Sequence, residues 1–241
     1  MKPTVSVVVP ARNEEANIEA CLRSILQQSP APLEVILIDN GSTDRTGEIG
    51  RSLGVKVVYQ ATPGLHIARQ TGLEVAVGDV VAATDADCIV KQGWVGEIQE
   101  AFVDPSVVET YGPLEFFDAP PFDTLLAKYG WPLFVGIMDR LGQPNTSGGN
   151  HAVRRKVALE VGGYDVPFGE DLRLMLKLKE RGRIVYLPKA VVLTSGRRLK
   201  KGRFKMYGVH LKNIWRRLRG LPQDYGTDYY AERERARDKK Q

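Results

Sequence analysis

The chain has 241 residues, of which 43% are hydrophobic and 26% are charged, and 34 basic against 29 acidic residues give a formal net charge of +5. These are the values of a globular protein, so a disordered, collagen-like or coiled-coil chain is excluded. The length suits one ordinary α/β domain or two small ones. Cys21 and Cys88, the two cysteines, lack disulfide-framework and metal-ligand spacing, which favours a reducing setting and packing roles for both.

The basic excess is confined to one segment. Residues 1–194 carry 19 basic and 24 acidic residues, residues 195–220 carry 10 basic and no acidic residues, and residues 221–241 carry five of each. We therefore divide the chain into one domain, 1–194, and a basic C-terminal helical appendix with a polar tail, 195–241.

The start of the chain does not predict a leader or a membrane span. The sequence MKPTVSVVVPARNEE has too short an apolar run and too early a charge for a signal peptide. No stretch approaches the ~18 apolar residues that span a bilayer. We expect a cytoplasmic protein, with peripheral attachment to the inner face of the membrane as the alternative.

Strands and helices are expected to alternate through the first 90 residues. Aliphatic, β-branched runs predict buried strands at 5–9, 33–38, 55–59 and 79–84. Apolar residues at helical spacing predict helices at 13–27, 43–53 and 67–76, the first with Glu14 and Glu15 in the turn where the dipole favours acids. This order predicts an α/β fold with a mostly parallel central sheet flanked by helices.

The second half of the domain has a less regular pattern. It predicts helices at 94–102, 154–161 and 172–181 and strands at 107–115 and 184–187. The apolar, proline-bearing stretch 119–138 has no clean periodicity. Its centre, 125–138, is too short to span a bilayer, and it suits a core segment as well as one that dips into a membrane interface or holds a lipid.

Three of the predicted strands end in polar clusters, at 10–15, 39–44 and 84–87. Because ligands of an open parallel sheet bind at the carboxyl ends of its strands, these clusters predict one site. Neither G-x-G-x-x-G nor a P-loop motif is present. Asp85 and Asp87, on alternate residues after a buried strand, suit Mg²⁺ or Mn²⁺ shared with phosphates, although a loop with two solvated acids is the alternative.

Over roughly residues 4–200 the sequence resembles the family 2 glycosyltransferases of the GT-A fold. The resemblance rests on six segments in the order of the family: VSVVVPARNEE at 5–15, VILIDNGSTDRT at 35–46, PGLHIARQTGLEVAVGD at 63–79, ATDADC at 83–88, SGGNHAVRRKVALEVGGYD at 147–165 and GEDLRLMLKL at 169–178. It implies a single GT-A-like domain that transfers one sugar, with inversion, from a nucleotide-diphosphate sugar to an acceptor hydroxyl. Within this domain, it implies a nucleotide-binding half at about 1–90 and an acceptor half at about 91–194.

The resemblance also implies a role for individual residues. On the donor side, Pro10, Arg12 and Glu14 would line the nucleotide pocket. Asp39 would accept a hydrogen bond from the base, typically uracil, and Arg69 would contact donor phosphate or ribose. These roles imply a UDP-sugar as the donor, with a GDP-sugar as the alternative.

The remaining implied roles concern the metal and the acceptor. Asp85 would hold ribose and metal, and Asp87 the Mn²⁺ or Mg²⁺ that bridges the diphosphate. Asp171 would be the general base that takes the proton of the acceptor hydroxyl. Glu170, with Gly148, Gly149 and Asn150, would lie on the acceptor side. The alternatives are ordinary ones: helix N-terminal acids for Glu170 and Asp171, and a turn into the next helix for 147–150.

Two features depart from other members of the family. Many relatives have a metal-binding His shortly after the last core strand, whereas this chain reads VVLTS at 191–195, so further metal ligands are left open. The Q-x-x-R-W motif and the membrane helices of processive polysaccharide synthases are absent. Single-sugar transfer to a glycan or lipid-linked acceptor is therefore favoured.

The basic segment 195–220 admits four interpretations. It could be a lid whose Arg197, Arg198 or Lys201 reaches the donor diphosphate, as the segment after the core does in related enzymes. Its interleaved apolar residues also suit a peripheral anchor on an anionic membrane, or a solvated helix packed on the core. Because no nucleic-acid-binding motif accompanies the charge, nucleic acid is not an expected partner.

Two further functions compete with the one implied above. A polyprenyl-phosphate sugar transferase at the membrane surface shares the fold but uses a phosphate acceptor. A protein that binds sugar nucleotides or membranes without turnover would lack a working base, so replacing Asp171 by Asn distinguishes it from an enzyme.

Overall fold

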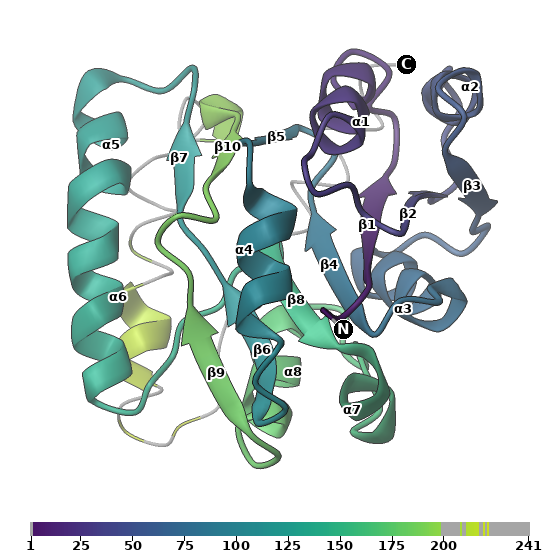
Figure 1. Cartoon of the computed structure of the whole chain (residues 1–241). Coiled ribbons are helices and arrows are strands. Elements are labelled where there is room, and N and C mark those ends of the chain that lie inside the picture. The colour runs from purple at the N-terminus through teal and green to yellow at the C-terminus, as the bar shows by residue number, and fades with distance from the viewer. Residues whose placement is uncertain (1, 199–207, 209–210, 217–218, 220, 222–241) are drawn as a thin grey trace. The chain divides into compact units, whose positions relative to one another are not determined.

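The computed structural model describes residues 2–198, 208, 211–216, 219 and 221 (Figure 1). Contacts divide the chain into two compact units, Met1–Ser195 and Gly196–Gln241. The predicted contacts of Lys201 lie outside the described residues. Arg198 ends a short 3₁₀ turn, Gly196–Arg198, and its side chain is not among the described parts.

The larger unit is built on a seven-stranded sheet. Its strands are β1 (Val5–Ala11), β2 (Glu34–Asp39), β3 (Lys56–Tyr59), β4 (Val80–Thr84), β6 (Val107–Tyr111), β8 (Asn150–Arg154) and β9 (Arg183–Tyr186). They lie in the order β3-β2-β1-β4-β8-β6-β9. β8 is antiparallel to both of its neighbours, and the other pairs are parallel. The mostly parallel α/β sheet expected from the sequence is therefore confirmed.

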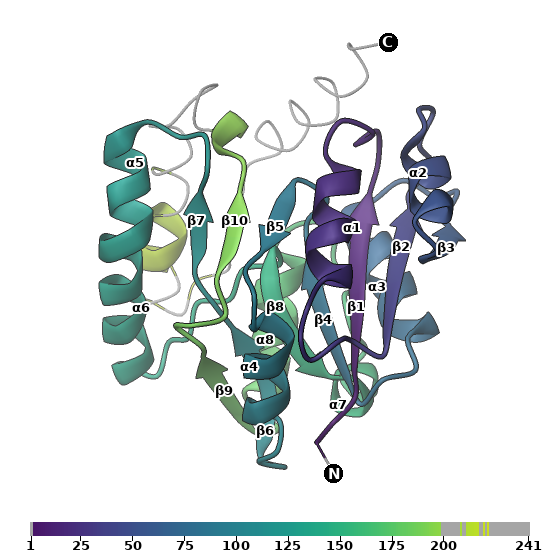
Figure 2. The same cartoon turned by 45° about the horizontal axis from the view of Figure 1, so that its top comes forward.

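Helices cover both faces of this sheet (Figure 2). They are α1 (Ile18–Leu26), α2 (Thr46–Ser52), α3 (Leu65–Val75), α4 (Trp94–Ala101), α7 (Arg155–Glu160) and α8 (Glu170–Leu178). Side chains of α1 and α4 pack in one buried cluster, against Val7 and Leu37 of the sheet. Side chains of α3, α7 and α8 pack in a second cluster, against Val8 and Ile36. Alternate residues of the same strands thus serve opposite layers, which explains why these strands are apolar throughout.

The predicted strand 107–115 is wrong as one element, because the chain bends at Gly112 and Pro113. β6 ends at Tyr111, and the next strand, β7 (Leu114–Phe116), belongs to a separate three-stranded sheet with β5 (Cys88–Val90) and β10 (Val192–Thr194). Pro113 has no N–H to donate to a ladder, and its carbonyl instead accepts a hydrogen bond from the Asn150 side chain.

The stretch 119–138, which has no clean periodicity in the sequence, is helical over most of its length. α5 (Pro121–Leu125), a π-helical turn (Leu126–Gly130) and α6 (Trp131–Arg140) follow one another without a break beside β7 (Figure 1). The sequence pattern hides this helix because its solvent-facing side is apolar as well as its buried side. No helix among the described residues has the length and hydrophobicity needed to cross a membrane.

The predicted helix 13–27 begins five residues late, at Ile18, so Glu14 and Glu15 are not in its first turn. Asn13 has a left-handed backbone conformation with a φ of 53°, which interrupts the helix at that point. The backbone N–H of Glu14 donates to Thr46 Oγ1 (2.9 Å), and the N–H of Glu15 donates to Asp44 (3.0 Å). The loop after β1 is therefore held by the loop after β2, and dipole stabilisation of these two acids is not their role.

Candidate active site

Two carboxylates follow the end of β4. Thr84, the last residue of the strand, donates from its hydroxyl to the carbonyl of Gly149 (3.0 Å), which fixes the strand end against β8. The side chain of Asp85 is 22% exposed, and Asp87 is buried. Since β1, β2 and β4 are mutually parallel, the loops after all three lie at the same edge of the sheet, as the sequence predicts.

The two carboxylates give this corner a negative field. Burial raises the pKa of Cys88 to about 12, and the charges of Asp85 and Asp87 add to that rise. Burial likewise raises the pKa of Cys21, with the same two carboxylates among the further causes. Both thiols are free and buried, which agrees with their predicted packing roles. Hard oxygen donors in such a field fit Mg²⁺ or Mn²⁺.

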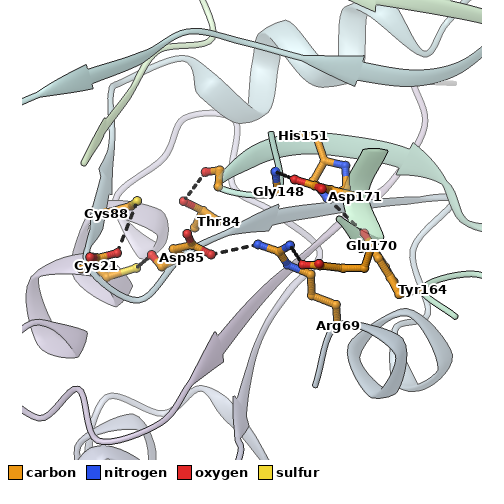
Figure 3. A network of polar contacts seen from close by, with 12 residues as sticks. Cys21, Arg69, Thr84, Asp85, Cys88, Gly148, His151, Tyr164, Glu170 and Asp171 are labelled. Carbon is orange, nitrogen blue, oxygen red and sulfur yellow. Dashed lines mark hydrogen bonds and ion pairs between the residues drawn. The ribbon is translucent and has the colours of Figure 1, made fainter. Parts of the chain in front are cut away.

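Arg69 of α3 lies between two carboxylates rather than facing open solvent (Figure 3). Its Nη2 donates to Asp85 Oδ1 (3.0 Å), and its Nη1 contacts the carboxylate of Glu170. The side chain is 4% exposed. Burial by itself would lower the pKa of Arg69, but Glu170 and Asp85 outweigh it and hold the pKa above its usual value. In this structure the guanidinium has two protein partners. The predicted contact of Arg69 with the donor stays a prediction.

Asp171 lies on the other side of the same group of residues, in the first turn of α8. Its Oδ2 accepts a hydrogen bond from the backbone N–H of Gly148 (2.7 Å), and its Oδ1 accepts one from the N–H of Leu172 (2.8 Å). The contact with Leu172 is what the alternative of a helix N-terminal acid predicts. The contact with Gly148 joins Asp171 to the 147–150 turn. Glu170 is buried against Arg69, and it also lies in the first turn of α8, where the helix N-terminal alternative places it.

The backbone at Gly148 and Gly149 passes close to the side chains of Arg69 and Asp85. The guanidinium of Arg69 lies directly over Gly148, where a Cβ would overlap with it. A Cβ on Gly149 would be 3.4 Å from Asp85 Oδ2, so the backbone here passes close to the donor-side carboxylate.

The side chain of Asn150 is buried at 2% exposure, and its acceptor-side role stays a prediction. Its Nδ2 donates to the carbonyls of Pro113 (2.9 Å) and Ala190 (2.8 Å), and its Oδ1 accepts from Trp94 Nε1 (2.9 Å). Asn150 thus joins four segments of the fold, a use of its amide that no local pattern indicates.

The predicted nucleotide pocket lies at the ends of β1 and β2. Pro10 pairs with Ile38 across these strands, and Asp39 is the last residue of β2. Asp39 is buried, and its Oδ1 accepts from the N–H of Ser42 (3.0 Å). Glu14 is also buried, and its carboxylate accepts from Asn17 Nδ2 (2.8 Å). The ligand roles of Pro10, Arg12, Glu14 and Asp39 stay predictions.

A buried polar chain behind the site was missed by the sequence analysis. His151 Nδ1 lies 3.2 Å from Glu109 Oε1, and its Nε2 lies 3.0 Å from the hydroxyl of Tyr164. Burial raises the pKa of Glu109, which the histidine partly opposes. The available signal was the lone carboxylate in VVETY at 107–111, because a charge inside a buried strand requires a partner.

An α/β sheet with carboxylates after β4 and at the start of α8 is the arrangement that the resemblance to GT-A glycosyltransferases implies. The model of the family described as glycosyl transferase family 2 matches residues 6–162, well over half of the chain. The chain therefore belongs to glycosyl transferase family 2, and the resemblance seen in the sequence is confirmed. It is 29% identical over 171 residues to glycosyltransferase AglE of Haloferax volcanii, a match that covers 67% of this chain and 56% of that protein.

Solved structures show the same fold. A mannosyltransferase from Pyrobaculum calidifontis, in complex with GDP-Man and Mn²⁺, aligns with a TM-score of 0.65 at 22% identity over 88% of this chain and 62% of that one. Glucosyl-3-phosphoglycerate synthase from Mycobacterium tuberculosis, in complex with Mn²⁺, UDP-glucose and phosphoglyceric acid, aligns with a TM-score of 0.62 at 25% identity over 93% and 82%. The chain thus spans less than two thirds of AglE and of the mannosyltransferase.

Proposed function

We propose that the chain transfers a single sugar, with inversion, from a UDP-sugar to an acceptor hydroxyl, with Asp171 as the general base. One observation carries this proposal: two consecutive glycines connect the base to the donor side. The N–H of Gly148 holds Asp171, and the backbone of Gly149 passes beside Asp85. A sugar above this turn would therefore lie between the carboxylate that takes a proton and the carboxylates that serve the diphosphate.

Each residue has a physical task in such a transfer. Asp171 takes the proton of the acceptor hydroxyl as the oxygen attacks the anomeric carbon. Its hydrogen bond from Gly148 restricts the direction in which the carboxylate points. Asp87 and Asp85 would hold Mn²⁺ or Mg²⁺, which neutralises the charge that grows on the leaving diphosphate. The structure of the M. tuberculosis synthase contains Mn²⁺, which supports this cofactor over a metal-free mechanism.

The donor proposal depends on Asp39 and on one relative. A buried carboxylate at the end of β2 suits the N–H of uracil as a hydrogen-bond partner. The M. tuberculosis synthase, at 25% identity, is in complex with UDP-glucose, which supports a UDP-sugar. The mannosyltransferase with GDP-Man is more distant, at 22% identity, and supports the fold alone.

A thermal-shift screen tests donor and metal together. We expect UDP with Mn²⁺ to stabilise the protein by about 2.7 kcal/mol at a concentration of 100 Kd, which raises Tm by roughly 5 °C or more. GDP or ADP with Mn²⁺, and UDP without metal, should shift Tm less. Asp87→Asn should remove the Mn²⁺-dependent part, whereas Glu160→Gln, the same charge change on an exposed residue of α7, should not. Equal, metal-independent shifts with all nucleotides would contradict the metal and donor assignments.

A lipid-linked acceptor at a membrane surface is the second candidate, and the α5–α6 helix favours it. Its exposed side carries an apolar ridge, which consists of Phe122, Leu125, Leu126, Tyr129, Leu133, Ile137 and Leu141. Five residues of this helix line a hollow of about 210 Å³, namely Phe122, Leu125, Leu126, Tyr129 and Gly130. Exposed contiguous apolar surface of this kind is typical of interaction sites and suits acyl chains.

Co-sedimentation with anionic vesicles tests the apolar ridge. Leu133 is 68% exposed. Its replacement by Glu should lower the membrane partition coefficient of the protein roughly tenfold, since burial of a leucine contributes about 1.5–3 kcal/mol. Val103→Glu, at a 52% exposed apolar position outside the ridge, should have no effect. Binding that survives Leu133→Glu but disappears at high salt would assign the attachment to the basic segment instead. Absence of binding at low salt would contradict both.

A further inference from the structure

We propose that Arg69 and Glu170 are positioning residues, which set the base Asp171 in place relative to the donor carboxylate Asp85. This inference rests on the proposed function, because it assigns a role within that same site. It differs from the donor contact expected from the sequence: Arg69 acts on two protein carboxylates rather than on phosphate.

Arg69 joins parts of the chain that are far apart in the sequence. Arg69 lies in α3, Asp85 follows β4, and Glu170 is the first residue of α8. The two terminal nitrogens each take a different carboxylate, and the Arg69 and Glu170 side chains are 4% and 7% exposed. Because both terminal nitrogens of the planar guanidinium are paired, it fixes the direction as well as the distance between the two carboxylates. The low exposure limits competition from water. The start of α8 is thereby held at a defined place relative to the end of β4.

Gly148 connects this ion-pair network to the base (Figure 3). A Cβ at position 148 would overlap with the guanidinium carbon and with both terminal nitrogens of Arg69, so the arginine lies flat on the glycine. The N–H of the same glycine donates to Asp171 Oδ2 (2.7 Å). Arg69 is therefore linked to Asp171 by two routes, through the backbone that it covers and through Glu170, the neighbour of Asp171 in α8.

The charge of Arg69 is needed as well as its shape. Asp85 and Glu170 both pair with the guanidinium, so two carboxylates share its positive charge. Without it, like charges would repel one another and move the start of α8 away from β4. Since a displacement of 1 Å can lower a rate about 100-fold, such a movement affects the chemical step more than donor binding.

The backbone that carries Arg69 is anchored from behind. Gln70, the next residue of α3, accepts a hydrogen bond at Oε1 from the N–H of Tyr164 (2.9 Å). The hydroxyl of Tyr164 contacts His151 of β8 (3.0 Å). The buried chain that ends at Glu109 thus holds α3 to β8, the strand that follows Gly148, and supports the position of the arginine.

The test is a double-mutant cycle on the kcat for hydrolysis of a UDP-sugar, in which water is the acceptor and UDP is released. The substrate is the UDP-sugar that stabilises the protein most. We expect Glu170→Gln to lower kcat about 10- to 100-fold, while the Kd for UDP with Mn²⁺, measured by calorimetry, changes less than about threefold. Arg69→Lys should lower kcat by about 100-fold, and the double variant should be no slower than Arg69→Lys alone. Gly148→Ala, which keeps every charge but displaces the guanidinium, should reproduce the loss.

Arg173→Gln is the matched control, because Arg173 pairs with Asp165 (3.0 Å) on the exposed side of the same helix. It should leave kcat and Kd unchanged. Multiplicative losses in the double variant, or an unchanged kcat in folded Glu170→Gln, would overturn the positioning role. Glu170→Gln decides the matter if Arg69→Lys does not fold. A wild-type protein that neither binds UDP with Mn²⁺ nor releases UDP would instead contradict the proposed function, so the two failures are distinguishable.

Discussion

Asp171→Asn should lower kcat for UDP release or sugar transfer by about 10²–10⁴-fold, the contribution typical of a general base. The amide is the same size as the carboxylate, and its oxygen can still accept the hydrogen bond from Gly148, although its nitrogen cannot accept the one from Leu172. The variant should therefore keep the wild-type Kd for UDP with Mn²⁺ and lose only about 1 kcal/mol of stability, the typical contribution of one hydrogen bond. Steady-state kinetics and calorimetry on the same preparation measure both quantities.

Asp165→Asn is the control for this experiment. Asp165 lies just before α8, and its carboxylate pairs with Arg173 (3.0 Å) and Lys177 (2.8 Å) on the surface. Because exposed ion pairs contribute at most about 1 kcal/mol, this variant should be nearly as stable as wild type and fully active. Undiminished UDP release by Asp171→Asn would show that Asp171 is not the base.

Asn150→Ala should lower the free energy of unfolding by about 3 kcal/mol or more. The truncation leaves the indole N–H of Trp94 and the carbonyl of Ala190 without their hydrogen-bond partner in a buried region, whereas the carbonyl of Pro113 keeps the N–H of Val192. Each such group costs roughly 1–3 kcal/mol when it is left unsatisfied. Urea denaturation followed by tryptophan fluorescence measures the loss, with the slope m compared between the two proteins to check that unfolding stays two-state.

Gln99→Ala provides the comparison, since its amide also donates to a proline carbonyl, that of Pro3 (3.2 Å), but in a partly exposed place. Its loss should be about 1 kcal/mol or less because water replaces the amide. If the two variants lose the same stability, the structural role assigned to Asn150 is wrong and its side chain becomes available again as an acceptor-side group.

The first half of the fold and the general place of the site were predictable from local patterns. The aliphatic runs that became β1, β2 and β4 are buried on both faces, and such strands have a distinctive composition. Parallel pairing then brings their polar carboxyl ends, including Asp39 and Asp85, to one edge of the sheet. This step needs only the alternation of strands and helices and the handedness of their connections.

The partners of individual side chains were not predictable in this way. Nothing near Arg69 in the sequence indicates that it lies between Asp85 and Glu170, because Glu170 is 101 positions away. Asn150 has the same neighbours in the sequence whether it faces a ligand or the core. The helix over 121–140 was hidden for a different reason, since its exposed side lacks the polar residues that mark an amphipathic helix.

The sequence by itself was enough for the resemblance to the family, which six ordered segments carry. It also determined the α/β order of elements and the acidic residues available for chemistry, because these depend on short-range spacing. Only the tertiary structure decided which carboxylates share Arg69, that Gly148 lies between that arginine and Asp171, and that Asn150 belongs to the core. The physical reason is that hydrogen bonds and ion pairs depend on distance and direction in space to within fractions of an ångström. Those quantities are set by the packing of α3, β4, β8 and α8 together, and no single segment contains them.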